Sequence, residues 1–249
     1  MTTPEAGPGP DETLDSFYHG RIRIIQKKRG YRFSVDAPLL ADFIRTRPGE
    51  ELLEVGTGCG VIALLLSLKP FRSLLALEVQ PGLADLARRN VALNGLTDRI
   101  AVAEGDIRAF APGRRFDVVF SNPPYVRARA GHLSRSPQRS AAKHELAGTI
   151  FDIMRRTREF LQEDGRAYFI FPERRRQDLM TAAEAADLGP RALRPVRPRA
   201  AEAANLVLVE LAPGAGAGEG AILSPLILFG ADGAYTPEAE RIFAGRTEP

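Results

Sequence analysis

The sequence has 249 residues, of which 44% are hydrophobic and 26% are charged, proportions typical of a soluble globular protein. No apolar run approaches the ~20 residues of a membrane-spanning helix, and the acidic, proline- and glycine-rich first residues do not form a secretory signal. The single cysteine, Cys59, cannot form an intrachain disulfide. We therefore expect a cytoplasmic protein whose residues 1–15 are a disordered lead-in.

The rest of the chain predicts an α/β fold. Residues 21–26 form an amphipathic strand, and a helix begins between Ser34 and Pro38. Strands and helices then alternate, which indicates a mostly parallel sheet with helices on both faces. The expected strands cover residues 51–55, 73–80, 99–106, 116–122, 166–172, 191–199 and 204–212. The last two lie too close in sequence for a parallel crossover, so they should form an antiparallel hairpin at the edge of a seven-stranded sheet.

A glycine-rich turn, EVGTGCG, follows the first strand of this series. Gly56, Gly58 and Gly60 let the backbone turn tightly and approach a ligand without a Cβ in the way. The helix that begins after them offers unpaired N–H groups. The spacing differs from the G-x-G-x-x-G motif of pyrophosphate-binding loops, so a ligand with a pyrophosphate is not favoured.

Polar side chains follow the next three strands. Glu78 ends the second strand, where dinucleotide-type folds place an acid for ribose hydroxyls, and Asp106 follows the third, where it could accept from an adenine amine. Asn122 follows the fourth. Either acid alone could be a helix N-cap, but the carboxyl ends of parallel strands meet at one edge, and the set together predicts a ligand site there.

With these motifs in place, residues 34–211 resemble the class I S-adenosylmethionine-dependent methyltransferases, which implies a Rossmann-like sheet and S-adenosyl-L-methionine as cofactor. By this resemblance the three glycines shape the loop beneath the amino-acid part of the cofactor, and Glu54 lies at the base of that loop. Glu78 would take the ribose hydroxyls, while Asp106 and Ile107 would contact the adenine. No metal is expected, because the three histidines show no metal-binding spacing.

The sequence NPPY, at Asn122–Tyr125, indicates methyl transfer to a planar nitrogen. Such a nitrogen is a poor nucleophile because its lone pair is delocalised. The side-chain oxygen of Asn122 and the carbonyl of Pro123 can accept its two N–H protons and direct the lone pair at the methyl group, while Tyr125 offers a face for a flat substrate. We therefore predict that these three residues are catalytic through positioning and electrostatics, with Asn122 also close to the cofactor.

Basic side chains follow this motif without an intervening acid. The expected substrate-binding cations are Arg127, Arg129, Arg135, Arg139 and Lys143. A base that is flipped into the site must bring its phosphates past this rim, so the stretch predicts an RNA partner, with tRNA as the first choice. Later arginine clusters, at 155–158 and 174–176, are interpreted as solvated faces.

The flanking segments resemble the tRNA adenine-N6 methyltransferase family, which acts on the adenosine beside the anticodon of a valine tRNA. The resemblance rests on QKKRGYRFSVDAPLLADFI before the glycine loop, AAKHEL at 141–146 and LILFGADGAYTPEAERI near the end. It implies N6-methyladenosine as the product, with Phe33 covering the ligand. It also implies one methyltransferase domain over residues 16–249, made of an N-terminal arm and helix (16–50), a core (51–212) and a C-terminal extension (213–249).

Other functions remain open from the sequence. NPPY also occurs in glutamine methyltransferases that act on release factors, although these usually carry a helical N-terminal domain and only about 50 residues precede this glycine loop. Another RNA or DNA amino-methyltransferase is a further alternative. A catalytically silent RNA-binding protein with the same fold is the non-enzyme alternative, and the intact NPPY sequence argues against it. The oligomeric state is not predicted.

Overall fold

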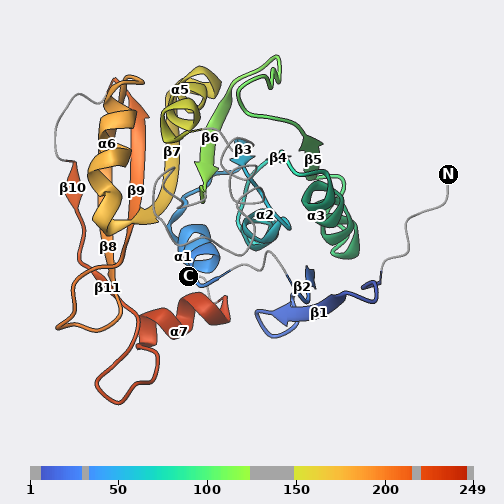
Figure 1. Ribbon diagram of the computed structural model, residues 1–249, viewed down its shortest axis with the longest axis horizontal. Helices are drawn as coiled ribbons and strands as arrows, with labels where there is room; N and C mark the ends of the chain where they lie inside the picture. The colour runs from blue at the N-terminus through green and yellow to red at the C-terminus, as the bar shows by residue number, and fades with distance from the viewer. Residues whose placement is uncertain (1–6, 30–33, 124–148, 215–219, 246–249) are drawn as a thin grey trace, which may run out of the picture.

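One large sheet organises the computed structural model, which describes residues 7–29, 34–123, 149–214 and 220–245 (Figure 1). Its long strands lie in the spatial order β5-β4-β3-β6-β7-β9-β8. They are β3 (Glu51–Val55), β4 (Ser73–Glu78), β5 (Ile100–Glu104), β6 (Phe116–Ser121), β7 (Leu161–Pro172), β8 (Leu188–Arg197) and β9 (Leu206–Pro213). Only β9 runs antiparallel to its neighbours, so the mostly parallel sheet and its β8–β9 hairpin are confirmed.

Two further strands correct the expected number of seven to nine. β10 (Ala221–Ile222) and β11 (Leu226–Ile227), both from the C-terminal extension, pair in parallel with the outer edge of β8. Two-residue strands carry no periodic pattern that a sequence could show. They form because an edge strand presents unpaired N–H and C=O groups that a passing segment can satisfy.

Helices cover both faces of the sheet. Helices α1 (Asp36–Phe43), α2 (Val61–Leu66), α3 (Pro81–Leu93) and α7 (Pro237–Ala244) pack on one face. Helices α5 (Ile150–Phe160) and α6 (Arg176–Glu184) pack on the other, and the short 3-10 helix η1 (Glu173–Arg175) leads into α6. In β7, Tyr168 and Ile170 join the first core while Phe169 and Phe171 join the second. This alternation explains why a strand buried on both faces reads as an unbroken apolar run.

An N-terminal hairpin corrects the expected disorder at residues 12–15. Strand β1 (Glu12–Phe17) pairs antiparallel with β2 (Ile22–Lys27), so residues 12–15 lie in a strand. The carboxylate of Glu12 is buried between Arg89 of α3 (2.8 Å) and Lys27 (2.9 Å). The hydrogen bond from Arg89 is the main reason that the pKa of Glu12 falls to about 2. β1 is held in place by these ion pairs and has a polar sequence, so no hydrophobic pattern could predict it.

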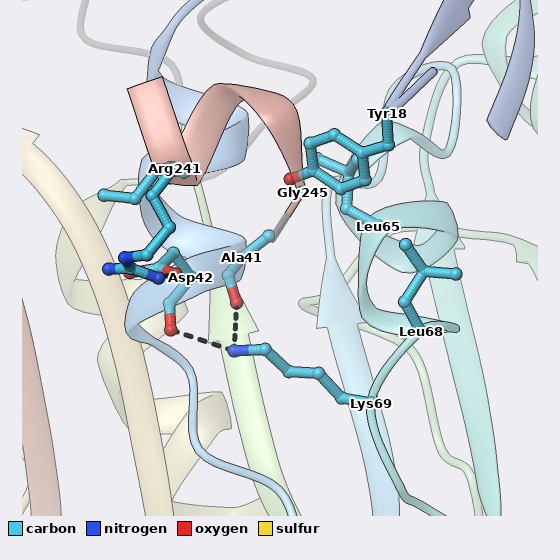
Figure 2. A pocket seen from close by; sticks show the side chains of 9 residues that line it. Tyr18, Ala41, Asp42, Leu65, Leu68, Lys69, Arg241 and Gly245 are labelled. Atoms are coloured by element: carbon cyan, nitrogen blue, oxygen red, sulfur yellow. Dashed lines mark hydrogen bonds and ion pairs between the residues drawn. The ribbon is translucent and has the colours of Figure 1, made fainter. Parts of the chain in front are cut away.

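The C-terminal extension packs on the core through α7. Beneath it, the Nζ of Lys69 donates to the carbonyl oxygens of Ala41 and Asp42 at 2.7 and 2.8 Å (Figure 2). It also donates to the carbonyl of Ile44 at 2.7 Å, so it caps the end of α1. Arg241 of α7 donates to the Asp42 carboxylate at 3.1 Å. Burial lowers the pKa of Lys69 to about 8. A small cavity of about 30 Å³ remains between these groups.

The N-terminal hairpin and the end of α7 meet beside this cavity. Tyr18 lies in the turn of the N-terminal hairpin, and Gly245 ends α7 in a left-handed conformation (φ 65°). The ring of Tyr18 packs so closely on Gly245 that an added Cβ would lie 2.1 Å from the ring, so only glycine fits there. Figure 1 accordingly draws the blue hairpin and the red helix along the same lower side of the molecule.

Candidate active site

The glycine loop lies between β3 and α2 and is held against the end of β4. Gly56, Gly58 and Gly60 have φ values of 75°, 60° and 86°, a region that side chains with a Cβ rarely adopt. The N–H groups of Gly56 and Thr57 both donate to the carbonyl of Leu77, at 2.8 and 3.0 Å. A Cβ added to Gly56 would meet nothing within 4 Å. The loop is therefore fixed in place while its first glycine borders open space.

Glu54 supports this loop from below. Its side chain is fully buried, and one carboxyl oxygen accepts a hydrogen bond from the Thr57 hydroxyl at 2.6 Å. Burial raises the pKa of Glu54 to about 8, so the buried carboxyl is largely neutral near pH 7. Glu54 therefore lies at the base of the loop, as expected, and its hydrogen bond with Thr57 holds the loop to the end of β3.

Glu78 ends β4 and faces the same loop. Its two carboxyl oxygens accept from the N–H groups of Gly58 (2.8 Å) and Gln80 (2.9 Å). Burial raises the pKa of Glu78, and these backbone hydrogen bonds oppose that rise. A carboxylate has about four acceptor positions, so these bonds leave acceptor capacity for hydroxyl donors. Glu78 thus joins the glycine loop to the edge where the sequence predicted a ribose.

Asp106 and Ile107 follow β5 in a short turn, where the N–H of Gly105 donates to the Glu78 carbonyl at 2.9 Å. Ile107 is buried. The Asp106 carboxylate accepts from the backbone N–H (2.8 Å) and the Nε (2.9 Å) of Arg108, and this side-chain bond lowers its pKa. The carboxylate is therefore charged, and its occupation by Arg108 is a feature that the sequence did not predict.

Asn122 and Pro123 follow β6 directly beside the glycine loop. The hydroxyl of Ser121 donates to the carbonyl of Val55 at 2.7 Å, and Val55 immediately precedes Gly56. Pro123 is buried and Asn122 is partly exposed. The structure therefore brings the start of the NPPY sequence to the same edge as the loop, Glu78 and Asp106. The remaining predicted site residues lie outside the described residues: Phe33, Tyr125, Arg127, Arg129, Arg135, Arg139 and Lys143.

Other chemistry is not indicated in the described part of the chain. No cluster of three or more histidine, cysteine or acidic residues could hold a metal among these residues. None of their helices is long and apolar enough to cross a membrane. Burial raises the pKa of the Cys59 thiol to about 12, which makes it unreactive and agrees with its expected packing role.

Comparison with known proteins identifies the family. A family model described as the methyltransferase small domain matches residues 32–177, more than half of the chain. The chain belongs to this methyltransferase family. A Porphyromonas gingivalis protein named tRNA1(Val) (adenine(37)-N6)-methyltransferase is 31% identical over 94% of each chain. A second P. gingivalis protein of that name, from strain W83, is 32% identical over 80% of this chain and 79% of its own. The resemblance drawn from the flanking segments is thereby confirmed.

The fold of this methyltransferase also matches solved structures. The crystal structure of a predicted O-methyltransferase from Agrobacterium tumefaciens superposes with a TM-score of 0.67 at 20% identity, covering 86% of this chain and 98% of that one. At this identity the likeness shows the fold alone. It confirms the Rossmann-like architecture, in which the glycine loop and the strand-end residues share one edge.

Asn90 is a site-supporting residue of the methyltransferase that sequence reasoning missed. It lies in α3 and is fully buried. Its Oδ1 accepts from the N–H of Ile25 (2.7 Å), and its Nδ2 donates to the carbonyls of Ile25 and Cys59, both at 2.9 Å. One side chain therefore links the N-terminal hairpin to the glycine loop. An asparagine on the apolar face of a predicted helix was the only available signal.

Arg156 is the second residue that was missed. From α5, its Nε donates to the carbonyl of Ile107 at 3.0 Å, and another nitrogen donates to the carbonyl of Phe110. Its guanidinium lies 4.6 Å from the centroid of the Phe160 ring. These contacts attach the turn that contains Asp106 to α5, the helix that packs over this turn. The sequence interpretation had assigned this arginine to a solvated face, and that interpretation was wrong.

Proposed function

We propose that this protein uses S-adenosyl-L-methionine to methylate the exocyclic N6 of an adenosine in tRNA, in the cytoplasm. Adenosine 37 of a valine tRNA is the proposed target, because the P. gingivalis relative named for that reaction aligns over 94% of both chains. The observation that carries the chemistry is the position of Asn122 and Pro123, the two residues that follow the hydrogen bond from Ser121 to Val55.

The residues at this edge fit the proposed cofactor. Open space beside Gly56 accommodates the amino-acid part, the remaining acceptor positions of Glu78 suit two ribose hydroxyls, and the buried Ile107 gives an apolar contact for the adenine. Asp106 can serve the adenine amine if it shares its carboxylate with Arg108 or exchanges that partner. When bound, the cofactor supplies an electrophilic methyl group on a sulfonium centre.

The chain's own contribution is to orient and polarise the amine. The side-chain oxygen of Asn122 and the carbonyl of Pro123 would accept hydrogen bonds from the two N6–H groups, which turns the nitrogen lone pair toward the methyl group. The bound cofactor would supply the methyl group that the nitrogen takes up, and it would leave as a neutral thioether. The cationic amine then loses one proton readily to water, because it is far more acidic than the neutral amine. No strong base is required, so positioning and electrostatics supply the catalysis.

The test is methyl transfer from labelled cofactor to a valine tRNA transcript, followed by nucleoside analysis. We expect labelled N6-methyladenosine from the wild type and no label from a matched transcript in which position 37 is guanosine. Asn122→Ala should abolish the product with the adenosine-37 transcript. Label in a release-factor glutamine, with none in tRNA, would overturn the proposal.

A further inference from the structure

The ends of three neighbouring strands form a row beside the proposed active site. At the end of β7, the N–H of Glu173 donates to the carbonyl of Asn205 at 3.0 Å, and the N–H of Asn205 donates to the carbonyl of Val196 in β8 at 3.0 Å. β7 is the parallel neighbour of β6, the strand that leads to Asn122. The segments that follow β7 and β8 therefore lie at the same sheet edge as Asn122.

Exposed arginines occupy both segments. Arg174 and Arg176 follow β7, and Arg199 lies two residues beyond β8; the side chains of Arg176 and Arg199 are 45% and 56% exposed. Arg176 pairs with Glu173 and Arg199 with Glu202, each at 3.0 Å. The Arg199 pair is exposed on both sides and contributes little stability, so Arg199 can exchange its carboxylate for a phosphate at small cost. Arg176 can make the same exchange, although its partner Glu173 is only 23% exposed.

An exposed aromatic ring adjoins these arginines. The N–H of Phe229 donates to the carbonyl of Pro198, next to Arg199, at 2.9 Å. The ring of Tyr235 stacks on Phe229 with centroids 5.0 Å apart and planes 19° from parallel, yet Tyr235 remains 45% exposed. Phe229 supports one face of the ring, and Phe243 also packs against it, with centroids 4.8 Å apart and planes tilted by 51°. The exposed part of such a supported ring can stack on an unpaired base.

We propose that Arg174, Arg176, Arg199 and Tyr235 form an RNA-docking rim. The arginines bind phosphates of the tRNA backbone on either side of the target nucleotide, and Tyr235 stacks on an unpaired neighbouring base. The inference rests on the proposed function and deepens it, because it assigns the C-terminal extension a part in substrate binding. It also changes the interpretation of the 174–176 cluster, which joins the rim by virtue of its place at the end of β7.

The salt dependence of tRNA binding tests the rim. We expect Arg174→Ala, Arg176→Ala and Arg199→Ala each to weaken tRNA binding and to reduce the log–log salt slope by roughly 0.7 to 0.9, the value for one lost phosphate contact. Arg72→Ala is the matched control, because Arg72 is exposed and pairs with Glu51 at 3.9 Å but precedes β4 at the opposite edge. Its slope should equal that of the wild type.

Tyr235 is tested by paired substitutions. Tyr235→Phe should bind tRNA like the wild type, whereas Tyr235→Leu should raise the KM for tRNA roughly tenfold or more, without changing kcat or cofactor affinity. Thermal unfolding identifies any variant that fails for lack of folding, and Arg174→Glu and Arg199→Glu then provide tests at exposed positions. Wild-type slopes in all the arginine variants would overturn the rim while leaving the proposed function intact. A wild type that neither binds nor methylates tRNA would overturn both.

Discussion

The asparagine that joins the hairpin to the glycine loop gives the sharpest quantitative prediction. Asn90→Ala removes the partners of three buried backbone groups: the N–H and C=O of Ile25 and the C=O of Cys59. A buried polar group without a partner costs ~1–3 kcal/mol. Partial relaxation will recover some of this, so we expect the free energy of unfolding to fall by about 3–6 kcal/mol.

Asn94 provides an internal control one helical turn later. Its side chain makes the same reciprocal pair with the hairpin, accepting from the N–H of Arg23 (2.9 Å) and donating to its carbonyl (2.7 Å). These bonds are exposed, so water replaces them when the side chain is lost. Asn94→Ala should therefore cost less than about 1.5 kcal/mol.

Urea unfolding at constant pH measures both costs, and calorimetry with S-adenosylmethionine measures the functional effect. Only Asn90→Ala should weaken cofactor binding, because only Asn90 contacts the glycine loop, through the carbonyl of Cys59. If the Asn94 variant loses as much stability as the Asn90 variant, burial does not decide how much these hydrogen bonds contribute to the free energy of unfolding, and the reasoning fails.

Four further predictions concern the site itself. Asn122→Ala should lower kcat at least a hundredfold and leave cofactor affinity near the wild-type value; steady-state kinetics with an unchanged kcat would contradict the assigned role. Glu78→Ala should weaken cofactor binding in calorimetry by ~1.5–3 kcal/mol, the usual value of hydrogen bonds to a charged group. Arg156→Ala should raise the cofactor Kd roughly tenfold through the Ile107 turn, whereas the neighbouring Arg155→Ala, which loses an exposed pair with Glu159, should not. Glu54→Gln tests a buried carboxyl whose pKa is raised from 4.5 to about 8. Because the folded wild type holds a proton that the unfolded chain releases, its free energy of unfolding should fall relative to that of the variant as pH rises from 4.5 to 8, by at most about 5 kcal/mol. Parallel curves of stability against pH for the two proteins would refute the assignment.

Much of this fold could be predicted because its central strands are buried on both faces. The apolar runs at residues 51–55 and 166–172 and the glycine turn each carry a strong local signal. Glu78, Asp106 and Asn122 could be grouped because the ends of parallel strands share one edge. Their positions directly after predicted strands were enough to place them together at that edge.

Features that depend on long-range polar contacts could not be predicted. β1 has a polar sequence, and it is ordered by ion pairs to Lys27 and to Arg89, 77 residues away. Asn90 and Arg156 contact backbone carbonyls, which every residue possesses, so nothing in the sequence identifies their partners. The short strands β10 and β11 exist only because β8 has a free edge beside them.

The contact between Tyr18 and Gly245 can form only late in biosynthesis. The hairpin is among the first segments to leave the ribosome, yet the surface around Tyr18 stays uncovered until α7 has been made. A nascent chain therefore carries exposed apolar surface for most of its synthesis, the condition in which chaperones bind and aggregation begins. A message that is truncated shortly before α7 would yield a chain with an intact glycine loop but an uncovered core, and quality control would recognise it as unfinished.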